Sequence, residues 1–343
     1  MGILDFLKKK KDAKLDAEKK EIEGRQTEQP SINEVVVPGY NYLYESTDWQ
    51  SFYAIIPELL ANRPCFCITG KNPEKLKGSL NLMGMHALWI TGIENKLPSA
   101  SPERIEFEIT QHALNFMQKN NGCVILIDDV DYLTVMTDFE KMMDFLKALG
   151  DTSSYTSSSV IVHICPGFFS NTEISLLKST FDRNIAVRNI QTTNRVAGTY
   201  ILPRMEYHRL ANVVNGFGGA GRKLIISVIH PNKLKPFFGS ENDYYFLTNT
   251  EREIPVVRPW ATETDFIITI KKYTERGGKT VVIDGLECIY STLDFKRFLS
   301  FVKDITDIAS RDNFKLFCVF NEGVANKTEA IAIKQRFDAY VSQ

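Results

Sequence analysis

Several features that would define a protein class are missing from this sequence. No apolar run approaches the ~20 residues that a membrane-spanning helix needs, and the longest apolar stretches, such as residues 123–127, are only strand-like. We therefore expect no integral membrane protein. The amino terminus places its apolar residues before its lysines and has no cleavage site, which is the reverse of a secretory signal. Together these absences predict a cytoplasmic location.

An excess of charge of one sign is also missing. The chain has 41 Lys and Arg against 42 Asp and Glu, a net charge of -1, so it has no overall attraction to nucleic acid or to an anionic membrane. Neither half of the chain presents a basic stripe with interleaved aromatic residues. We therefore predict that the protein does not bind nucleic acid.

The six cysteines lack the spacings of metal sites. They contain no CxxC pair and lie in or beside apolar, strand-like runs: Cys65, Cys67, Cys123, Cys165, Cys288 and Cys318. This pattern is typical of reduced, buried thiols in a cytosolic chain. A metal site formed by Cys65, Cys67, His163 and Cys165 is the alternative, but none of the usual ligand spacings supports it. The sequence predicts neither a metal nor another cofactor.

The first feature that is present is a charged amino-terminal segment. Residues 1–25 carry a short apolar head, which includes Leu4 and Phe6, followed by lysines and acidic residues. We expect a solvated amphipathic segment that stays flexible or docks on a partner. The alternative is a weak membrane-surface anchor formed by residues 1–11. Residues 26–39 are polar and contain proline, which predicts a linker.

The rest of the sequence repeats itself when it is shifted by 156 to 158 residues. A strand followed by Pro-x-Lys-Leu-Lys opens both halves, at residues 67–77 and 225–235, and further matches are spread evenly to Phe337-Asp338. At 343 residues the chain has about two domain lengths. We therefore predict two tandem repeats, residues 40–187 and 198–343, joined by a linker at residues 188–197.

Each repeat alternates short apolar runs with longer amphipathic segments, which predicts an α/β fold with a mostly parallel sheet between two layers of helices. Strands of the first repeat are expected near residues 41–44, 65–69, 86–91, 123–128 and 159–165. A helix is expected from Ser101, as its cap, to Lys119. Apolar stripes predict two more helices, one from Phe139 to Leu149 and its counterpart from Phe295 to Ile305.

Two apolar strands that end in aspartate, at Asp128 and Asp284, resemble the Mg²⁺-binding strand of P-loop ATPases. The glycine-rich phosphate loop of those enzymes is not found, however. The loop after the strand at 65–69 reads Gly70-Lys-Asn-Pro-Glu-Lys75, and its counterpart at residues 228–233 has no glycine. Neither repeat is therefore expected to hold ATP in the usual way.

One glycine-rich segment matches a nucleotide-binding pattern in the wrong context. Gly216-Phe-Gly-Gly-Ala-Gly221 fits GxGxxG, but it follows a helical stretch and precedes a strand, whereas the dinucleotide motif needs the opposite order. We expect it to be the loop that ends a helix.

The two repeats share polar residues where strands end, which is the side of a parallel sheet where ligands bind. These candidate site residues are Thr91, Glu94, Asp128, Asp131, Thr248, Glu251, Asp284 and Glu287. Their carboxylates could bind a divalent cation or transfer protons. The alternative is that they cap helices and satisfy loop amides, because no His, Lys or Ser recurs beside them. No residue is assigned a catalytic, cofactor-binding or metal-binding role.

Several segments resemble the archaeal domain-of-unknown-function family 835. In the first repeat they are residues 67–76, Leu88-Trp-Ile-Thr91, residues 127–133 and residues 145–149; the more divergent second repeat keeps Pro231-Asn-Lys-Leu234, Phe246-Leu-Thr248 and residues 282–287. The resemblance implies a cytoplasmic α/β domain similar to a recombinase-type ATPase core that has lost its phosphate loop. Such domains often accompany signalling modules. The family has no assigned activity, so it supplies no functional residues.

These observations favour a non-catalytic interaction or regulatory protein whose repeats pack together or against a protein partner. The main alternative is a nucleotide- or metal-dependent enzyme or binder that uses the carboxylates at the strand ends. A third hypothesis is an adaptor recruited to membranes by residues 1–11.

Overall fold

The computed structural model describes residues 36–47, 49–60, 62–80, 84–186, 198–219, 221–250 and 253–341. Residues 37–343 form one compact unit. The predicted charged segment 1–25, most of the linker 26–39 and the whole linker 188–197 lie outside the described residues, and the exact domain limits stay a prediction.

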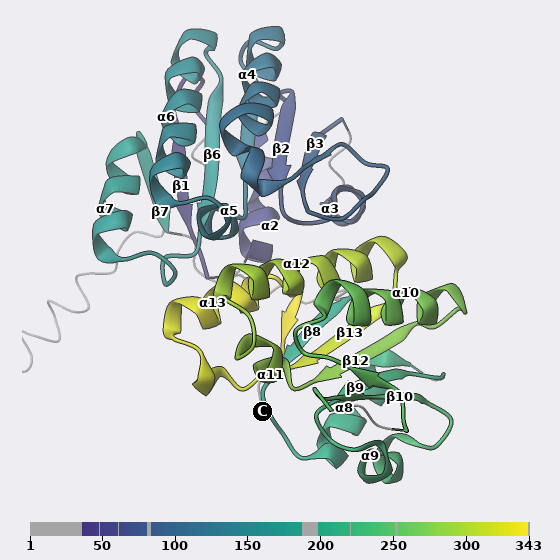
Figure 1. Cartoon of the computed structure of the whole chain (residues 1–343). Helices are drawn as coiled ribbons and strands as arrows, with labels where there is room; N and C mark the ends of the chain where they lie inside the picture. Colours follow the sequence, from purple (N-terminus) through teal and green to yellow (C-terminus); the bar gives the residue numbers. More distant parts are fainter. Residues whose placement is uncertain are drawn as a thin grey trace, which may run out of the picture. The chain divides into compact units, whose positions relative to one another are not determined.

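Seven parallel strands form the first sheet, in the order β4-β3-β2-β5-β6-β1-β7 (Figure 1). They are β1 (Tyr42–Glu45), β2 (Cys65–Thr69), β3 (His86–Ile90), β4 (Ser99–Ala100), β5 (Val124–Ile127), β6 (Ser159–Ile164) and β7 (Arg183–Ala186). The five strands expected from the sequence are all present, because each is an apolar run long enough to be buried on both faces of a parallel sheet.

The second sheet repeats this topology strand for strand, in the order β11-β10-β9-β12-β13-β8-β14. Its strands are β8 (Thr199–Leu202), β9 (Leu224–Ser227), β10 (Asp243–Leu247), β11 (Val256–Val257), β12 (Thr280–Asp284), β13 (Lys315–Val319) and β14 (Ala339–Tyr340). The structure therefore confirms two tandem α/β units.

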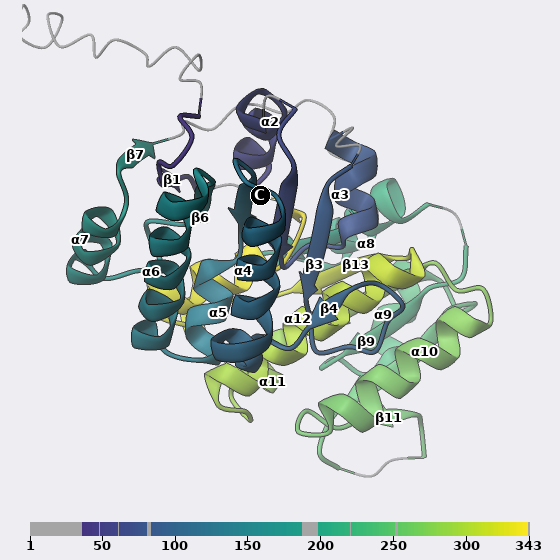
Figure 2. The ribbon, with the colours of Figure 1, turned by 90° about the horizontal axis from the view of Figure 1, so that it is seen from above.

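Helices cover both faces of each sheet. In the first repeat, α2 (Trp49–Leu60) and α3 (Pro73–Leu80) lie on one face, and α4 (Thr110–Lys119) and α6 (Phe139–Thr156) lie on the other (Figures 1 and 2). The short α5 (Val130–Met136) follows β5, and α7 (Asn171–Thr180) precedes β7. This is the predicted three-layer arrangement.

The second repeat has the same layers. Helices α8 (Tyr207–Gly218) and α9 (Pro231–Phe238) cover one face, and α10 (Ile267–Glu275) and α12 (Phe295–Asp312) cover the other (Figure 1). The remaining helices are α11 (Leu286–Tyr290) after β12 and α13 (Lys327–Gln335) before β14. Helix α8 ends at Gly218 and β9 begins at Leu224, so the glycine-rich segment ends a helix as predicted, although its first three residues, 216–218, belong to the last turn of that helix.

The predicted apolar stripes form the core. Ile105, Ile109, Ala113, Met142 and Leu146 of the first repeat are at most 2% exposed, and so are Phe298, Leu299, Val302 and Ile305 of the second. One continuous cluster of buried apolar side chains includes all of these residues, so it takes in both repeats. A separate cluster between α8, α9 and the second sheet includes Leu210, Leu234 and Val282.

The helix predicted from Ser101 to Lys119 differs in detail from the observed one. A 3-10 turn (Pro102–Arg104) and a π-helical turn (Ile105–Ile109) precede α4, and Ser101 makes no side-chain cap. The Ser101 hydroxyl donates to the carboxylate of Glu103 instead, which removes it from the helix amides. The second repeat has a π turn at the corresponding place, Thr262–Phe266.

None of the helices in the described part of the chain is long and apolar enough to cross a membrane. All six cysteines are free, and every one except the half-buried Cys288 is buried. Burial raises the pKa of the Cys65 thiol to about 12 and that of the Cys165 thiol to about 11, so these thiols stay protonated and unreactive near neutral pH.

Candidate functional site

The strand order locates the place where an open parallel sheet binds ligands. From β2 the chain continues to β3 on one side, whereas from β5 it continues to β6 on the other. Adjacent strands whose connections leave in opposite directions define a topological switch point, and ligands bind outside their carboxyl ends. In the first sheet this point lies between β2 and β5, and in the second between β9 and β12.

Asp128 follows β5 at the first switch point and is fully enclosed. Its carboxylate accepts hydrogen bonds from the Tyr53 hydroxyl (2.6 Å), the Thr69 hydroxyl (2.8 Å) and the Gly70 amide (2.8 Å). Burial and the neighbouring charge of Asp129 raise the pKa of Asp128 to about 6, although the three hydrogen bonds oppose the shift. The carboxylate thus ties the end of β5 to the end of β2 and to helix α2.

Asp284 repeats this arrangement at the second switch point. It accepts hydrogen bonds from the Ser227 hydroxyl at the end of β9 (2.6 Å) and from the Tyr207 hydroxyl at the start of α8 (3.2 Å). Burial raises its pKa as well. Both repeats therefore use one aspartate, one strand-end hydroxyl and one tyrosine to join two strands and a helix.

Beside each of these aspartates, a glycine lies against a residue with a side chain, and the two repeats place the glycine at opposite positions of this pair. Gly70 lies against Asp129, and a Cβ atom at Gly70 would overlap the Asp129 carboxylate; in the second repeat Val228 lies against Gly285, where a Cβ atom would overlap the Val228 side chain. Asp129 and Gly285 both have positive φ, 66° and 103°. The contact has room for only one side chain, and only the first repeat places a carboxylate there.

Asp129 and Asp131 bind an arginine of the second repeat. The guanidinium of Arg336, which follows α13 and whose side chain is 1% exposed, pairs with both carboxylates, at 3.0 Å for Asp131. It also lies over the ring of Tyr132, 5.1 Å from the ring centroid. Burial raises the pKa of Asp131 and the charge of Arg336 opposes this. The second repeat therefore contacts the first at the carboxyl ends of its strands.

Thr91 takes part in the same contact. It is buried at the end of β3, and its hydroxyl donates to the carboxylate of Asp307 on α12. The ammonium of Lys303 also donates to Asp307, and it lies 5.8 Å from the Trp89 ring centroid and 5.9 Å from that of Tyr132. The Lys303 and Asp307 side chains are only 2% and 6% exposed.

The loop at the predicted phosphate-loop position, residues 70–75, also contacts the second repeat. The Lys71 ammonium donates to the backbone carbonyl of Gln335 at the end of α13 (2.9 Å) and lies 4.8 Å from the centroid of the Trp49 ring. Burial lowers the pKa of Lys71. A cation at a helix carboxyl end is favourable because the last carbonyls carry partial negative charge.

The other four candidate residues have separate surroundings. Glu94 is exposed, and its backbone carbonyl accepts a hydrogen bond from Arg311 of the second repeat (2.9 Å). Thr248 accepts a hydrogen bond from the Thr250 amide (3.2 Å) and so closes its own loop. Glu287 pairs with Arg204 (3.3 Å). Glu251 lies outside the described residues.

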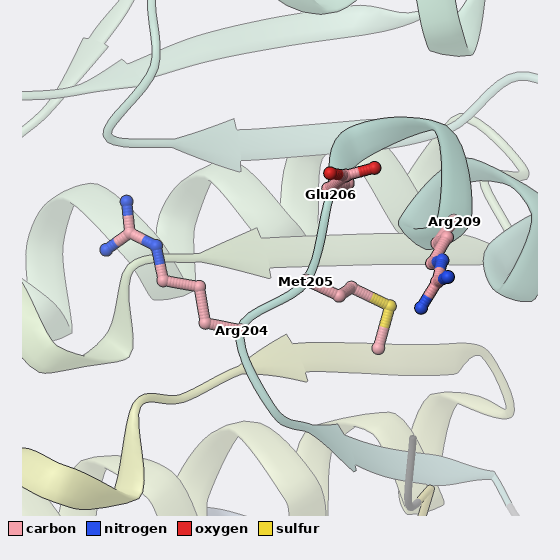
Figure 3. Close-up of a pocket in the computed structure, with 4 residues that line it drawn as sticks. All are labelled: Arg204, Met205, Glu206 and Arg209. Carbon is pink, nitrogen blue, oxygen red and sulfur yellow. The ribbon is translucent and has the colours of Figure 1, made fainter.

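A small hollow lies beside the second switch point, in the loop between β8 and α8. Its volume is about 440 Å³, and it is lined by Arg204, Met205, Glu206 and Arg209 (Figure 3). Arg204 and Arg209 would attract an anionic group, but the carboxylate of Glu206 lies between them in sequence and lines the same hollow.

The sequence did not identify Tyr53, Thr69, Asp129, Arg336 or Asp307 as site residues. Thr69 and Ser227 occupy the same place in the two repeats, so the recurrence of a hydroxyl at the strand end was a usable signal. Arg336 could have been noticed for the opposite reason, because Thr180 stands there in the first repeat. Within the described residues, no three His, Cys, Asp or Glu side chains are grouped to hold a metal ion, and His163 instead contacts Ser46 (3.2 Å).

These features define a class: a tandem α/β protein whose first sheet is closed at its carboxyl end by its own second repeat. Residues 45–181 and 216–337 match the family described as "Protein of unknown function (DUF835)". Since the two segments make up more than half of the chain, the protein belongs to this family. No curated protein matches the chain.

Proposed function

We propose that this protein is a non-catalytic interaction protein, in which the first repeat uses its ligand-binding side to hold the second repeat. The observation that carries the proposal is the position of Arg336. Its guanidinium reaches the switch point of the first sheet and pairs there with Asp129 and Asp131. A small-molecule ligand would have to displace this buried side chain.

The hydrogen bonds of the candidate carboxylates support the same proposal. Asp128 and Asp284 each accept hydrogen bonds from a tyrosine and a strand-end hydroxyl, and Asp128 also accepts one from the Gly70 amide, so both join parts of their own repeat. These aspartates lie where a P-loop ATPase strand would end, and we infer that each repeat is a nucleotide-binding type of domain adapted to protein contacts. The cytoplasmic location and a membrane contact through residues 1–11 stay predictions.

A nucleotide titration tests the proposal. The full chain is titrated calorimetrically with ATP and ADP, with and without Mg²⁺, and we expect no binding at micromolar concentrations. Binding with a micromolar dissociation constant that Asp128→Asn abolishes would overturn the proposal, because it would show that the first switch point is open to a ligand.

A second candidate function is the binding of a small anion by the second repeat. The observation that favours it is the hollow lined by Arg204 and Arg209. In the same titrations, binding that Arg209→Ala weakens at least tenfold, while Asp128→Asn leaves it unchanged, would assign the ligand to this hollow. Lys235→Ala on α9 serves as the charge-matched control and should have no effect.

A further inference from the structure

We propose that the contact between the two repeats is linked to protonation: Asp304 and Asp307 of α12 lie beside the buried ammonium of Lys303 against Thr91 and Gly92 of the first repeat, and together they take up a proton when the repeats meet. The contact then weakens as the pH rises. This link to protonation goes beyond the proposed function. It depends only on the contact between the repeats, so nucleotide binding in the second repeat would not contradict it.

Two carboxylates of α12 lie near the buried ammonium of Lys303, which pairs with Asp307. Asp307 receives hydrogen bonds from Lys303 and Thr91. Asp304 lies one helical turn away, and among the described residues its Oδ1 atom is buried without a hydrogen-bond partner. A Cβ atom at Gly92 would lie 3.3 Å from that oxygen, so the backbone of the first repeat is what covers it.

Charged groups on three elements act on Asp304. Asp307 on its own helix, Glu263 of the π turn before α10 and Glu103 of the 3-10 turn before α4 all disfavour its ionisation, and only Lys303 favours it. Tyr132 of α5 feels the charges of both aspartates. The charge of Asp307 disfavours the ionisation of Asp304, because like charges that close cannot both ionise freely.

The direction of the pH effect follows from the pKa of Asp304. Burial, with the charge of Asp307 as the next cause, raises it from 3.8 to about 7. A carboxyl group with a raised pKa binds its proton more tightly in the closed contact than in water. The stabilisation of the closed contact by this proton is therefore complete below about pH 4 and is lost as the pH rises to 7. The equilibrium constant for closing falls by at most tenfold per pH unit over this range.

Trp89 reports the contact, because it is fully buried and lies beneath Lys303. The experiment uses the full chain with Trp49→Phe and Trp260→Phe, so that Trp89 is the single tryptophan, and measures acrylamide quenching of its selectively excited fluorescence from pH 5 to 8.5. We expect quenching to rise severalfold between pH 5.5 and 7.5 and then to level off. In Asp304→Asn, which cannot ionise, quenching should not change with pH.

The matched control is Asp151→Asn, since Asp151 on α6 corresponds to Asp307 on α12 but is exposed; this variant should keep the wild-type pH profile. Quenching that is independent of pH in the wild type, or that keeps its slope in Asp304→Asn, overturns the proposal. If Asp304→Asn does not fold, the ¹³C carboxyl resonance of Asp304 decides the question: a midpoint near 7 supports the proposal, and one near 4 contradicts it.

Discussion

At the scale of single residues, the sequence predicted that Asp128 and Asp284 lie at the carboxyl ends of strands, but it did not predict their hydrogen-bond partners. Asp128 and Asp284 follow from their place at the end of apolar runs, because the carboxyl end of a parallel strand emerges into a loop. Their partners could not be predicted, since Tyr53 and Thr69 are ordinary residues until the fold brings them to Asp128 from 75 and 59 residues away.

The glycine lies at position 70 in the first repeat and at position 285 in the second, and this difference gives a prediction for single residues. Gly70→Ala should lower the free energy of unfolding by roughly 1–3 kcal/mol, because the new methyl group overlaps the Asp129 carboxylate. In an Asp129→Gly background, which imitates Gly285, the same substitution should cost less. Urea unfolding of the four proteins in this double-mutant cycle measures the difference.

Gly78→Ala is the control for this cycle, because nothing lies within 4 Å of a Cβ atom at that exposed helical position. It should be neutral or slightly stabilising. Equal costs of Gly70→Ala with and without Asp129 would contradict the steric explanation.

At the scale of helices, the sequence predicted α6 and α12 because both have a regular apolar stripe, and the structure gives them 18 residues each. It did not predict the π turns before α4 and α10, since an extra residue in a helical turn changes the apolar spacing only locally. Nor did it predict that α12 and α13 contact the first repeat. That contact includes polar residues of the second repeat, such as Arg336 and Asp307, that no apolar pattern reveals.

Removing the arginine after α13 tests this contact. Arg336→Ala should lower the free energy of unfolding by about 3–5 kcal/mol, because it leaves two buried carboxylates without their cation. The triple variant Arg336→Met, Asp129→Asn, Asp131→Asn should regain most of this loss, since no unpaired charge is left. Thermal or urea unfolding at pH 7 measures both.

Thr180→Ala provides the comparison, because Thr180 is the counterpart of Arg336 and is partly exposed. It should change the unfolding free energy by less than about 0.5 kcal/mol. An effect of Arg336→Ala as small as this would mean that the ion pairs contribute little to the contact.

At the scale of the whole molecule, the internal repeat predicted two similar units, and the two sheets have the same strand order because each strand and helix recurs in sequence. What the repeat could not predict is the difference between the units. The carboxyl end of the first sheet is covered by α13 and Arg336. The first repeat has Thr180 at the position that corresponds to Arg336, and the second repeat has Gly285 at the position that corresponds to Asp129.

Because one apolar cluster takes in both repeats, we expect the chain to unfold in a single transition. In Trp260→Phe the remaining tryptophans, Trp49 and Trp89, report the first repeat and its contact with the second, whereas circular dichroism at 222 nm reports the helices of both repeats. The two signals should give the same urea midpoint at pH 6. Separate midpoints would show that the repeats unfold independently.

The contact of Arg336 with Asp131 also has a consequence for the order of events during synthesis. The two residues are 205 positions apart, and ribosomes add about 5–20 residues per second. The last strand of the first sheet ends at Ala186, 150 residues before Arg336, so the first sheet can be complete for roughly 8–30 seconds before its arginine exists. Throughout that interval Asp129 and Asp131 face water or a chaperone, so the nascent protein presents an acidic surface that the finished protein conceals.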